Sequence, residues 1–339
     1  MGCSISGLNT LYVAATGGGE VWINERRFRV IRQIGEGGFA VVYLVKEQQP
    51  ASDAAPSKRH DAHVSGLPPR SLMIRLSEPS WRAGLSKEQL DLVKEEIRVS
   101  SLFSHPNLFP LLDHAIIGVK SAQGDLSHEA YLLFPVHLDG TLLDNASIML
   151  SRKEFYSTAD VLQIFRQHMH SFDPPYAHND VKPGNVLITH CKGKAPVATL
   201  MDFGSARPAR KQIRSSSEAL QLQEWAAEHC SAPYRAPELW DCPSHADIDE
   251  RTDIWSLGCT LYAIMFHVSP FEYALGESEE SMQLAIANGQ LEWPAGPNPP
   301  YPDELRQFVI WMLHPQPVMR PHIGDVTLHV DKLIAKYLS

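Results

Sequence analysis

The sequence predicts an α+β fold of two lobes, a small β-rich N-terminal lobe that carries one helix and a larger, mainly helical C-terminal lobe. Residues 28–45 alternate apolar and polar side chains around a cluster of glycines, which is typical of two strands joined by a tight loop. Residues 86–103 place apolar side chains at helical spacing. From about residue 158 onwards the pattern is mostly helical.

The composition is that of a folded protein, and the length allows one two-lobed domain or two domains. Its 339 residues are 44% hydrophobic and 20% charged, unlike disordered chains. The formal net charge of −9 argues against a protein that binds nucleic acid over its whole surface, because such proteins neutralise many phosphates with clustered Lys and Arg. The five cysteines form no C-x-x-C pair, and the sequence has no secretory or membrane-spanning apolar run. We therefore expect a reducing, cytosolic-side location.

The N-terminus carries a pattern for two lipid groups. It reads MGCSIS, so removal of Met1 exposes Gly2 to myristoylation and leaves Cys3 beside it for palmitoylation. Two acyl chains anchor a protein stably where one does not, because each buried CH₂ contributes about 0.8 kcal/mol. The alternative is a Met-Gly start and a nearby cysteine that occur by chance. We expect residues 1–27 to form a lipid-anchored segment and residues 28–335 to form the folded domain.

The N-terminal lobe is expected over residues 28–136 and the C-terminal lobe over residues 137–335. After the hairpin, the remaining elements of the first lobe are expected in this order: a polar, mobile loop rich in Pro, Ala and Ser at 47–70, a strand at 71–76, the amphipathic helix at 86–103 that begins at Ser86, and strands at 108–118 and 130–136 around a polar stretch at 119–129.

Glycines cluster inside the first hairpin. Residues 35–42 read GEGGFAVV between two predicted strands, and glycines there let the backbone approach phosphate oxygens and direct N–H groups at them. A plain glycine turn explains the same residues. Because a strand follows, the strand-to-helix context of a dinucleotide or Walker-type loop is absent.

Three motifs farther along the chain carry the chemistry. Residues 178–188 read HNDVKPGNVLI, residues 201–204 read MDFG and residues 236–238 read APE. In this order they match the catalytic loop, the metal-binding segment and the end of the activation segment of protein kinases. The chain therefore resembles protein kinases, and the resemblance implies the two-lobed protein-kinase fold.

The resemblance also implies Mg²⁺-dependent transfer of the ATP γ-phosphate to a protein hydroxyl. We expect no nucleic-acid partner, because no motif supports one. Phosphoryl transfer depends on positioning and on neutralisation of charge. Asp180 would accept the proton of the substrate hydroxyl, and Lys182 would lie against the transferring phosphate. Asn185 and Asp202 would supply the oxygen ligands that Mg²⁺, a hard cation, prefers. The alternative for each of the four is a solvated or capping polar residue.

The same resemblance assigns residues to ATP binding. Glu96 is the acid of the small-lobe helix that should pair with the lysine of the third strand, the alternative being one more surface Glu. Counted back from Gly140, Phe134 falls at the gatekeeper position and Pro135 to His137 fall at the hinge, where the Pro135 carbonyl can accept a hydrogen bond from adenine and the His137 N–H can donate one. The full set is Ile34, Gly35, Glu36, Gly37, Gly38, Val42, Arg75, Glu96, Phe134, Pro135 and His137.

Three further residues are expected to be structural. Asp253, in the segment DIWSLG, resembles the helix Asp of kinases that braces the backbone of the catalytic loop. Arg320 resembles the arginine that pairs with Glu238 beneath the activation segment. A buried ion pair of this kind marks architecture more than catalysis.

An added helix is expected inside the activation segment. Residues 214–230 carry a capping-box pattern at Ser215 and Glu218 and an apolar helical face that includes Trp225. Together with GEGGF, the Met-Gly-Cys start and DERTDIWSLGC, this helix resembles the Numb-associated kinase family, and within it the branch of myristoylated and palmitoylated serine/threonine kinases. That likeness implies phosphorylation of Ser and Thr, autophosphorylation, and residence on Golgi, vesicle or plasma membranes with a cytoplasmic pool.

The catalytic loop departs from the kinase pattern at Asn179, where most kinases have the Arg that pairs with a phosphorylated activation loop. We therefore expect that phosphorylation of this loop is not the switch that turns the protein on. The nearby basic run, Arg207, Arg210, Lys211 and Arg214, can bind an acidic peptide or lipid headgroups, but a solvated charged face is favoured.

Two more departures bear on activity. The third-strand motif, apolar-Ala-apolar-Lys, has its only counterpart in LMIR at residues 72–75, so Arg75 stands where lysine is expected, and its planar guanidinium is not a conservative replacement. The segment 158–170 is about a turn and a half shorter than the kinase helix it resembles. Two functions remain open. Intact Asp180, Asn185 and Asp202 favour an active kinase, whereas Arg75 favours a catalytically impaired pseudokinase that binds nucleotide and acts as a membrane scaffold.

Overall fold

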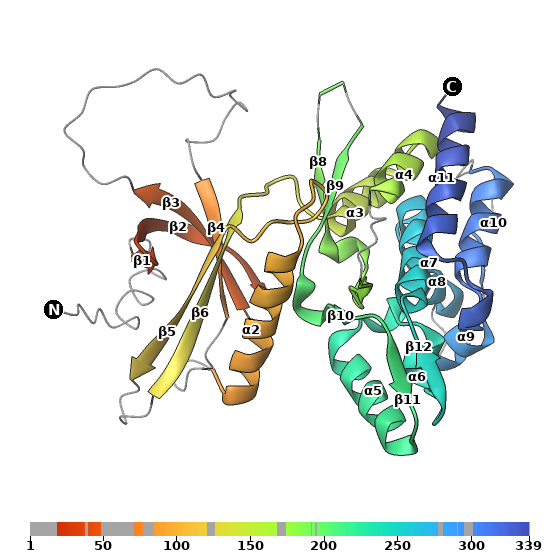
Figure 1. Ribbon diagram of the computed structural model, residues 1–339. Coiled ribbons are helices and arrows are strands. Elements are labelled where there is room, and N and C mark those ends of the chain that lie inside the picture. Colours follow the sequence, from red (N-terminus) through yellow and green to blue (C-terminus); the bar gives the residue numbers. More distant parts are fainter. Residues whose placement is uncertain are drawn as a thin grey trace. The chain divides into compact units, whose positions relative to one another are not determined.

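The computed structural model describes residues 19–37, 40–48, 71–77, 85–120, 126–167, 174–190, 192–193, 195–276, 281–289, 291–294 and 301–338 (Figure 1). They form two compact units. The first comprises the described residues within 1–104 and 110–136, and the second those within 105–109 and 137–339.

The first unit is an antiparallel sheet with one helix, α2. The strands have the order β1-β2-β3-β4-β6-β5 in the sheet. Their bounds are β1 Glu20–Ile23, β2 Arg26–Gly37, β3 Ala40–Gln48, β4 Ser71–Ser77, β5 Asp113–Lys120 and β6 Leu126–Pro135, and α2 spans Lys87–Leu102.

The predicted hairpin, third strand and amphipathic helix of this unit are confirmed as β2 with β3, β4 and α2. The helix begins where expected because Ser86 accepts a hydrogen bond from the Gln89 N–H while the Gln89 side chain accepts one from the Ser86 N–H, a complete capping box. Strand β1 was not predicted. It pairs with β2 across a tight turn in which Asn24 adopts φ 54°, a conformation that Asn tolerates better than most residues. The sheet therefore begins N-terminal to residue 28.

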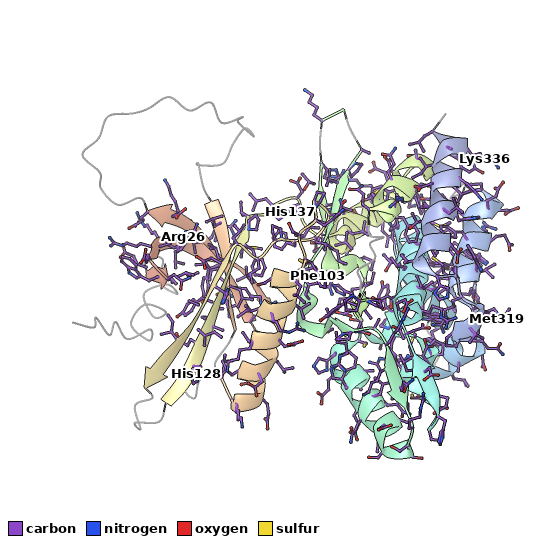
Figure 2. All side chains as sticks on the ribbon, in the orientation of Figure 1. Arg26, Phe103, His128, His137, Met319 and Lys336 are labelled. Carbon is purple, nitrogen blue, oxygen red and sulfur yellow. The ribbon has the colours of Figure 1, made fainter. Side chains whose placement is uncertain are left out.

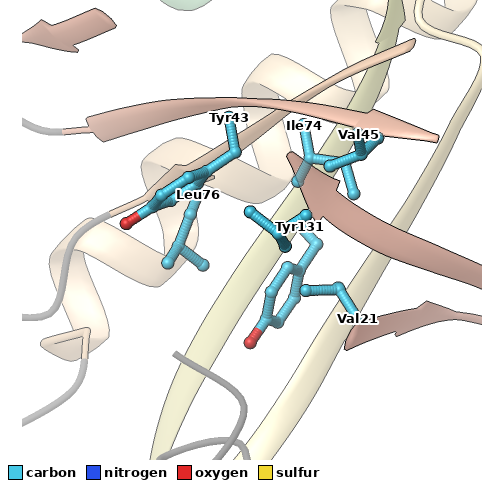
Figure 3. Close-up of a pocket in the computed structure, with 7 residues that line it drawn as sticks. Val21, Tyr43, Val45, Ile74, Leu76 and Tyr131 are labelled. Carbon is cyan, nitrogen blue, oxygen red and sulfur yellow. The ribbon is translucent and has the colours of Figure 1, made fainter. Parts of the chain in front are cut away.

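One hydrophobic cluster of the first unit lies on one face of this sheet. Val30, Val45, Ile74 and Leu76 are buried there together with Tyr131. Residues of this cluster, with Tyr43, line a small apolar hollow, and Figure 3 shows the two tyrosine rings beside its aliphatic side chains. Since side chains alternate along a strand, Arg75 projects to the opposite face of β4.

The second unit is mainly helical, as predicted. Its helices are α3 Leu142–Arg152, α4 Thr158–Arg166, α5 Ser216–His229, α6 Pro237–Trp240, α7 Arg251–Phe266, α8 Pro270–Leu275, α9 Met282–Asn288, α10 Asp303–Met312 and α11 Ile323–Tyr337, with the short turns η1 Pro183–Asn185, η2 Phe203–Ser205, η3 Ala232–Tyr234 and η4 Pro317–Met319. Three two-stranded pieces accompany them: β7 Tyr176–Ala177 with β10 Arg207–Pro208, β8 Val186–Thr189 with β9 Val197–Leu200, and β11 Lys211–Ile213 with β12 Ala246–Ile248.

Helix α7 is the centre of this unit. Every residue from Ile254 to Phe266 is buried, as expected of a helix that is apolar on all sides. Helices α4 and α10 both contact it. Gly258 permits the close approach of the chain after α10, because a Cβ at this position would lie 2.8 Å from Leu313 Cδ2.

The helix expected inside the activation segment is confirmed as α5. The Ser215 hydroxyl accepts a hydrogen bond from the Glu218 N–H at 3.2 Å, whereas the Glu218 carboxylate accepts from the Arg214 N–H at 2.6 Å. Only half of the predicted capping box is therefore formed. The helix α3 was not predicted, and α4 accounts for the described part of the predicted helix at 158–170 up to Arg166. None of the described helices combines the length and apolarity needed to span a membrane.

Candidate active site

A cluster of hydrogen-bonded polar side chains surrounds Asp180 in the second unit. Lys182 Nζ donates to Asp180 Oδ2 at 2.7 Å, and Asn185 Nδ2 donates to the same oxygen at 2.9 Å. The Ser231 N–H donates to the other oxygen, Asp180 Oδ1, at 3.0 Å. The carboxylate is nearly buried and is fixed through both oxygens, so its orientation is set before any substrate arrives.

Ser231 belongs to this cluster although it was not predicted from the sequence. Its hydroxyl lies 2.6 Å from Lys182 Nζ, which holds the lysine between Ser231 and Asp180. A lone serine between Cys230 and Ala232 belongs to no spacing pattern. The only sequence feature that could have pointed to Ser231 is its position, five residues before the APE motif at 236–238.

The backbone of the catalytic loop is held by Asp253 at the start of α7. Its carboxylate accepts hydrogen bonds from the His178 N–H at 2.5 Å and the Asn179 N–H at 2.8 Å. Burial raises the pKa of Asp253, and these two donors oppose that rise because they favour the charged form. The contacts brace the two residues that precede Asp180.

Asp202 follows Met201, which comes directly after β9 and is tied to the catalytic loop. The Met201 N–H donates to the Asn185 carbonyl at 2.9 Å, and His178 Nε2 lies 3.1 Å from the Met201 carbonyl. Asp202 adopts φ 65° and is exposed, and its Oδ1 accepts a hydrogen bond from the Gly204 N–H at 3.3 Å. Hydrogen bonds thus join the loop that carries Asp180, Lys182 and Asn185 to the segment that carries Asp202.

The donor set at this place suits Mg²⁺. Asn185 uses its amide nitrogen for Asp180, so the amide oxygen is the atom that a cation would use, and Asp202 adds a carboxylate on the adjoining segment. Among the described residues no group of three or more His, Cys, Asp or Glu side chains could hold a metal ion alone. Mg²⁺ does not need such a cage, because it usually takes one or two carboxylates together with substrate phosphates and water.

In the first unit the structure joins Arg75 to Glu96. The Arg75 guanidinium forms an ion pair with the Glu96 carboxylate of α2, and the Glu96 side chain is only 7% exposed. Glu96 is therefore a buried acid with a cationic partner, which excludes the alternative of a solvated surface Glu. The β4 register places Arg75 opposite Val42 of β3, and Gly35 of β2 is in turn opposite Val42.

The other predicted ATP-binding residues are distributed over both units. Phe134 and Pro135 end β6, where they pair with Met73 and Leu72 of β4. His137, labelled in Figure 2, is the first residue of the second segment of the second unit, and burial lowers its pKa. Ile34, Glu36 and Gly37 lie on β2, whereas Gly38, Gly2 and Cys3 lie outside the described residues, as do residues 49–70 of the expected loop.

Glu238 and Arg320 form a buried, bidentate ion pair. Arg320 Nη1 and Nη2 donate to the two carboxylate oxygens of Glu238 at 2.7 and 2.8 Å, and the Arg320 side chain is 0% exposed. Arg320 follows Met319, which is labelled in Figure 2. The pair joins α6 to the turn before α11.

Three arginines of the basic run in the activation segment have partners within the protein, whereas Lys211 is exposed. The Arg207 guanidinium lies over the Trp225 ring at 3.2 Å, Arg210 lies 3.6 Å from Glu250, and Arg214 lies 2.6 Å from Asp247. The Arg210 and Arg214 side chains are 71% and 48% exposed, which agrees with the solvated charged face that the sequence favours.

The comparison with a family model and the comparisons with individual relatives agree with one another. The model of the protein kinase domain matches residues 82–330. "Serine/threonine-protein kinase 16" of Mus musculus is 33% identical over 321 residues, and that of Homo sapiens is 34% identical over 321 residues, with 93% of this chain and 93% of the relative covered in each case. A probable serine/threonine-protein kinase of Dictyostelium discoideum is 28% identical over 379 residues, covering 92% of this chain and 95% of the relative.

Proposed function

This chain belongs to the protein kinase family, and from that premise we propose that it transfers the γ-phosphate of ATP to serine and threonine hydroxyls of proteins, its own included. The observation that carries the proposal is the Asp180 carboxylate, oriented by Lys182, Asn185 and Ser231. The relatives bear the name serine/threonine-protein kinase, which supports hydroxyls of these two residues as the acceptors.

Each side chain of the cluster has a distinct task in this proposal. Asp180 accepts a hydrogen bond from the substrate hydroxyl and takes its proton as the oxygen attacks. Lys182, an ammonium held 2.7 Å from Asp180 and 2.6 Å from Ser231, carries the positive charge that the transferring phosphate meets. Asn185 and Asp202 would hold Mg²⁺, which neutralises charge on the phosphates when it is bound.

Arg75 keeps a second function open. Its ion pair with Glu96 supports an active protein, because the strand cation is engaged with the helix acid as a kinase requires. A guanidinium nevertheless differs from an ammonium in size, planarity and hydration. The rival function is therefore a nucleotide-binding scaffold with little or no transfer.

The deciding experiment compares three purified proteins: wild type, Asp202→Asn and Arg75→Lys. Each is incubated with ATP and Mg²⁺, and phosphosites are identified by mass spectrometry. Phosphoserine or phosphothreonine that depends on Asp202 is the expected result. Transfer only by the Arg75→Lys protein would show that one residue disables the chemistry, and no transfer by any of the three would favour the scaffold.

A second part of the proposal is attachment to the cytosolic face of Golgi, vesicle or plasma membranes. It goes together with membership of the Numb-associated family and its lipid-modified branch, and the N-terminal pattern supports it. Its support is the MGCSIS start, which offers Gly2 and Cys3 for two acyl chains. The Gly2→Ala variant should move to the soluble fraction of cells. Unchanged membrane fractionation of that variant would contradict the anchor.

A further inference from the structure

Asn179 links the catalytic loop to the activation segment. It lies directly before Asp180 and adopts φ 64°, a left-handed conformation that Asn tolerates. Its side-chain Nδ2 donates to the Ala177 carbonyl and to the Ser205 carbonyl, each at 3.1 Å. Ser205 lies three residues after Asp202, so one neutral side chain holds the start of the activation segment against the loop that carries Asp180.

Ser205 is also tied to the far end of helix α5. Its hydroxyl donates to the His229 carbonyl at 2.7 Å. The His229 ring stacks on the Trp225 ring with centroids 4.9 Å apart, and the Arg207 guanidinium lies over Trp225. The contact made by Asn179 therefore continues through Ser205 into the C-terminal turn of α5.

The rest of the segment is held by backbone pairing and by the contacts of Arg214. Strand β10 pairs with β7, and β11 pairs with β12. Arg214 also donates to the Ala246 carbonyl at 3.2 Å and to Asp247. Where a phosphate organises such a segment, arginines supply the charge that binds it. Here Arg207, Arg210 and Arg214 already have protein partners.

We propose that Asn179 is a positioning residue whose neutral hydrogen bonds keep the activation segment, residues 202–236, ordered without a phosphate group on that segment. The part of the inference that concerns kcat rests on the proposed function, whereas the part that concerns the order of the segment does not. Phosphate transfer needs an ordered activation segment, because Ser231, which orients Asp180 and Lys182, lies near the end of that segment.

The test uses the full chain after phosphatase treatment, with the absence of phosphate on residues 202–236 verified by mass spectrometry. Amide hydrogen exchange is followed at residues 203–214, and kcat and KM for ATP are measured on the same samples. Asn179→Gly keeps the left-handed backbone accessible while it removes both hydrogen bonds. Asn179→Asp keeps the shape of the side chain without a donor. The matched control is Asn24→Gly, since Asn24 is also left-handed and also donates through its side chain, but in the first unit.

In the wild type, phosphatase treatment should change neither the exchange nor kcat by more than about twofold. Both Asn179 variants should exchange residues 203–214 about tenfold faster or more, with kcat reduced and KM for ATP nearly unchanged, while Asn24→Gly matches the wild type at these amides. Unprotected amides in the dephosphorylated wild type, or unchanged exchange in both Asn179 variants, would overturn the inference. If no protein transfers phosphate, the proposed function fails, but the exchange measurements still decide the role of Asn179.

Discussion

Ser231 is the residue at which the structure adds most to the site. Its N–H donates to Asp180, and its hydroxyl accepts a hydrogen bond from Lys182. In Ser231→Ala the lysine loses a hydrogen-bond partner, and a hydrogen bond to a charged group contributes about 1.5–3 kcal/mol. We expect kcat for peptide phosphorylation to fall roughly 10- to 100-fold, with KM for ATP nearly unchanged.

Ser231→Thr is the control, because it retains the hydroxyl and the backbone N–H. This variant should keep most of the activity. If Ser231→Ala and Ser231→Thr have the same kcat as the wild type, the hydroxyl does not orient the lysine.

We expect His267 to make the stability of the second unit depend on pH. Its Nε2 lies 3.0 Å from the Glu154 carbonyl, whereas its buried Nδ1 has no hydrogen-bond partner among the described residues. Burial lowers the pKa of His267 below its usual value of 6.5. The unfolded chain therefore takes up the proton first as the pH falls, and the free energy of unfolding should decrease below a pH of about 6.5.

Urea unfolding at pH values of about 7.5 and about 5.5 measures this effect. His267→Asn suits the φ of 65° at this position and does not titrate in that range. The decrease in unfolding free energy between the two pH values should be smaller in the variant than in the wild type. An equal decrease in both proteins would assign the pH dependence to other groups, such as His137 and His329, whose pKa values are also lowered by burial.

Among the elements, α6 and the turn before α11 depend on the Glu238–Arg320 pair. Arg320 also donates to the carbonyls of His314 and Pro315, so it is fully enclosed. Glu238→Ala would leave this cation buried without its counter-ion, which typically costs about 3–5 kcal/mol. Urea unfolding should show a loss of that size.

Glu304→Ala is the matched control for this measurement. Glu304 also pairs with a cation, Lys336, but both side chains are about half exposed, so solvent screens the pair. Its removal should leave the stability nearly unchanged. Equal losses in the two variants would show that burial does not distinguish these ion pairs.

The elements that could be predicted from the sequence are those with a long repeat or a cap. Helix α2 has four turns of apolar spacing and a serine cap, and α5 has the Ser215 cap. Strand β1 has only four residues, too few to establish an alternation. The strand expected from residue 108 begins at Asp113, because Leu108 instead bridges to Leu200 and the Phe109 N–H donates to the Leu200 carbonyl within the second unit.

For the molecule as a whole, motifs predicted the fold and part of the site. Asp180, Lys182 and Asn185 fall within one short stretch, so their proximity follows from the sequence. The contacts of Ser231 could not be predicted in this way, because they depend on how the chain returns after α5, 49 residues beyond Lys182. The contact of Asn179 with Ser205 likewise joins segments that no spacing rule connects, whereas the pairing of Arg75 with Glu96 was expected from the resemblance to kinases.

The charge of the whole molecule leads to a prediction about membrane attachment. The formal net charge of −9 opposes approach to an anionic membrane, and three arginines of the basic run are engaged within the protein. Attachment should therefore depend on acyl chains, whose burial salt does not weaken. Raising NaCl from about 0.1 M to about 0.5 M, which shortens the Debye length below about 10 Å, should leave binding of the acylated protein to liposomes unchanged within about twofold.

Cosedimentation of acylated protein with liposomes, with and without anionic lipid, gives the comparison. A protein held by basic residues would dissociate at high salt and would need the anionic lipid, because each Lys or Arg near the surface contributes about 1 kcal/mol through a screened attraction. The non-acylated Gly2→Ala, Cys3→Ser protein should fail to sediment in every condition. If that variant still binds, and salt releases it, the basic run of the activation segment faces the membrane after all, and the intramolecular partners of its arginines must be exchanged for lipid headgroups.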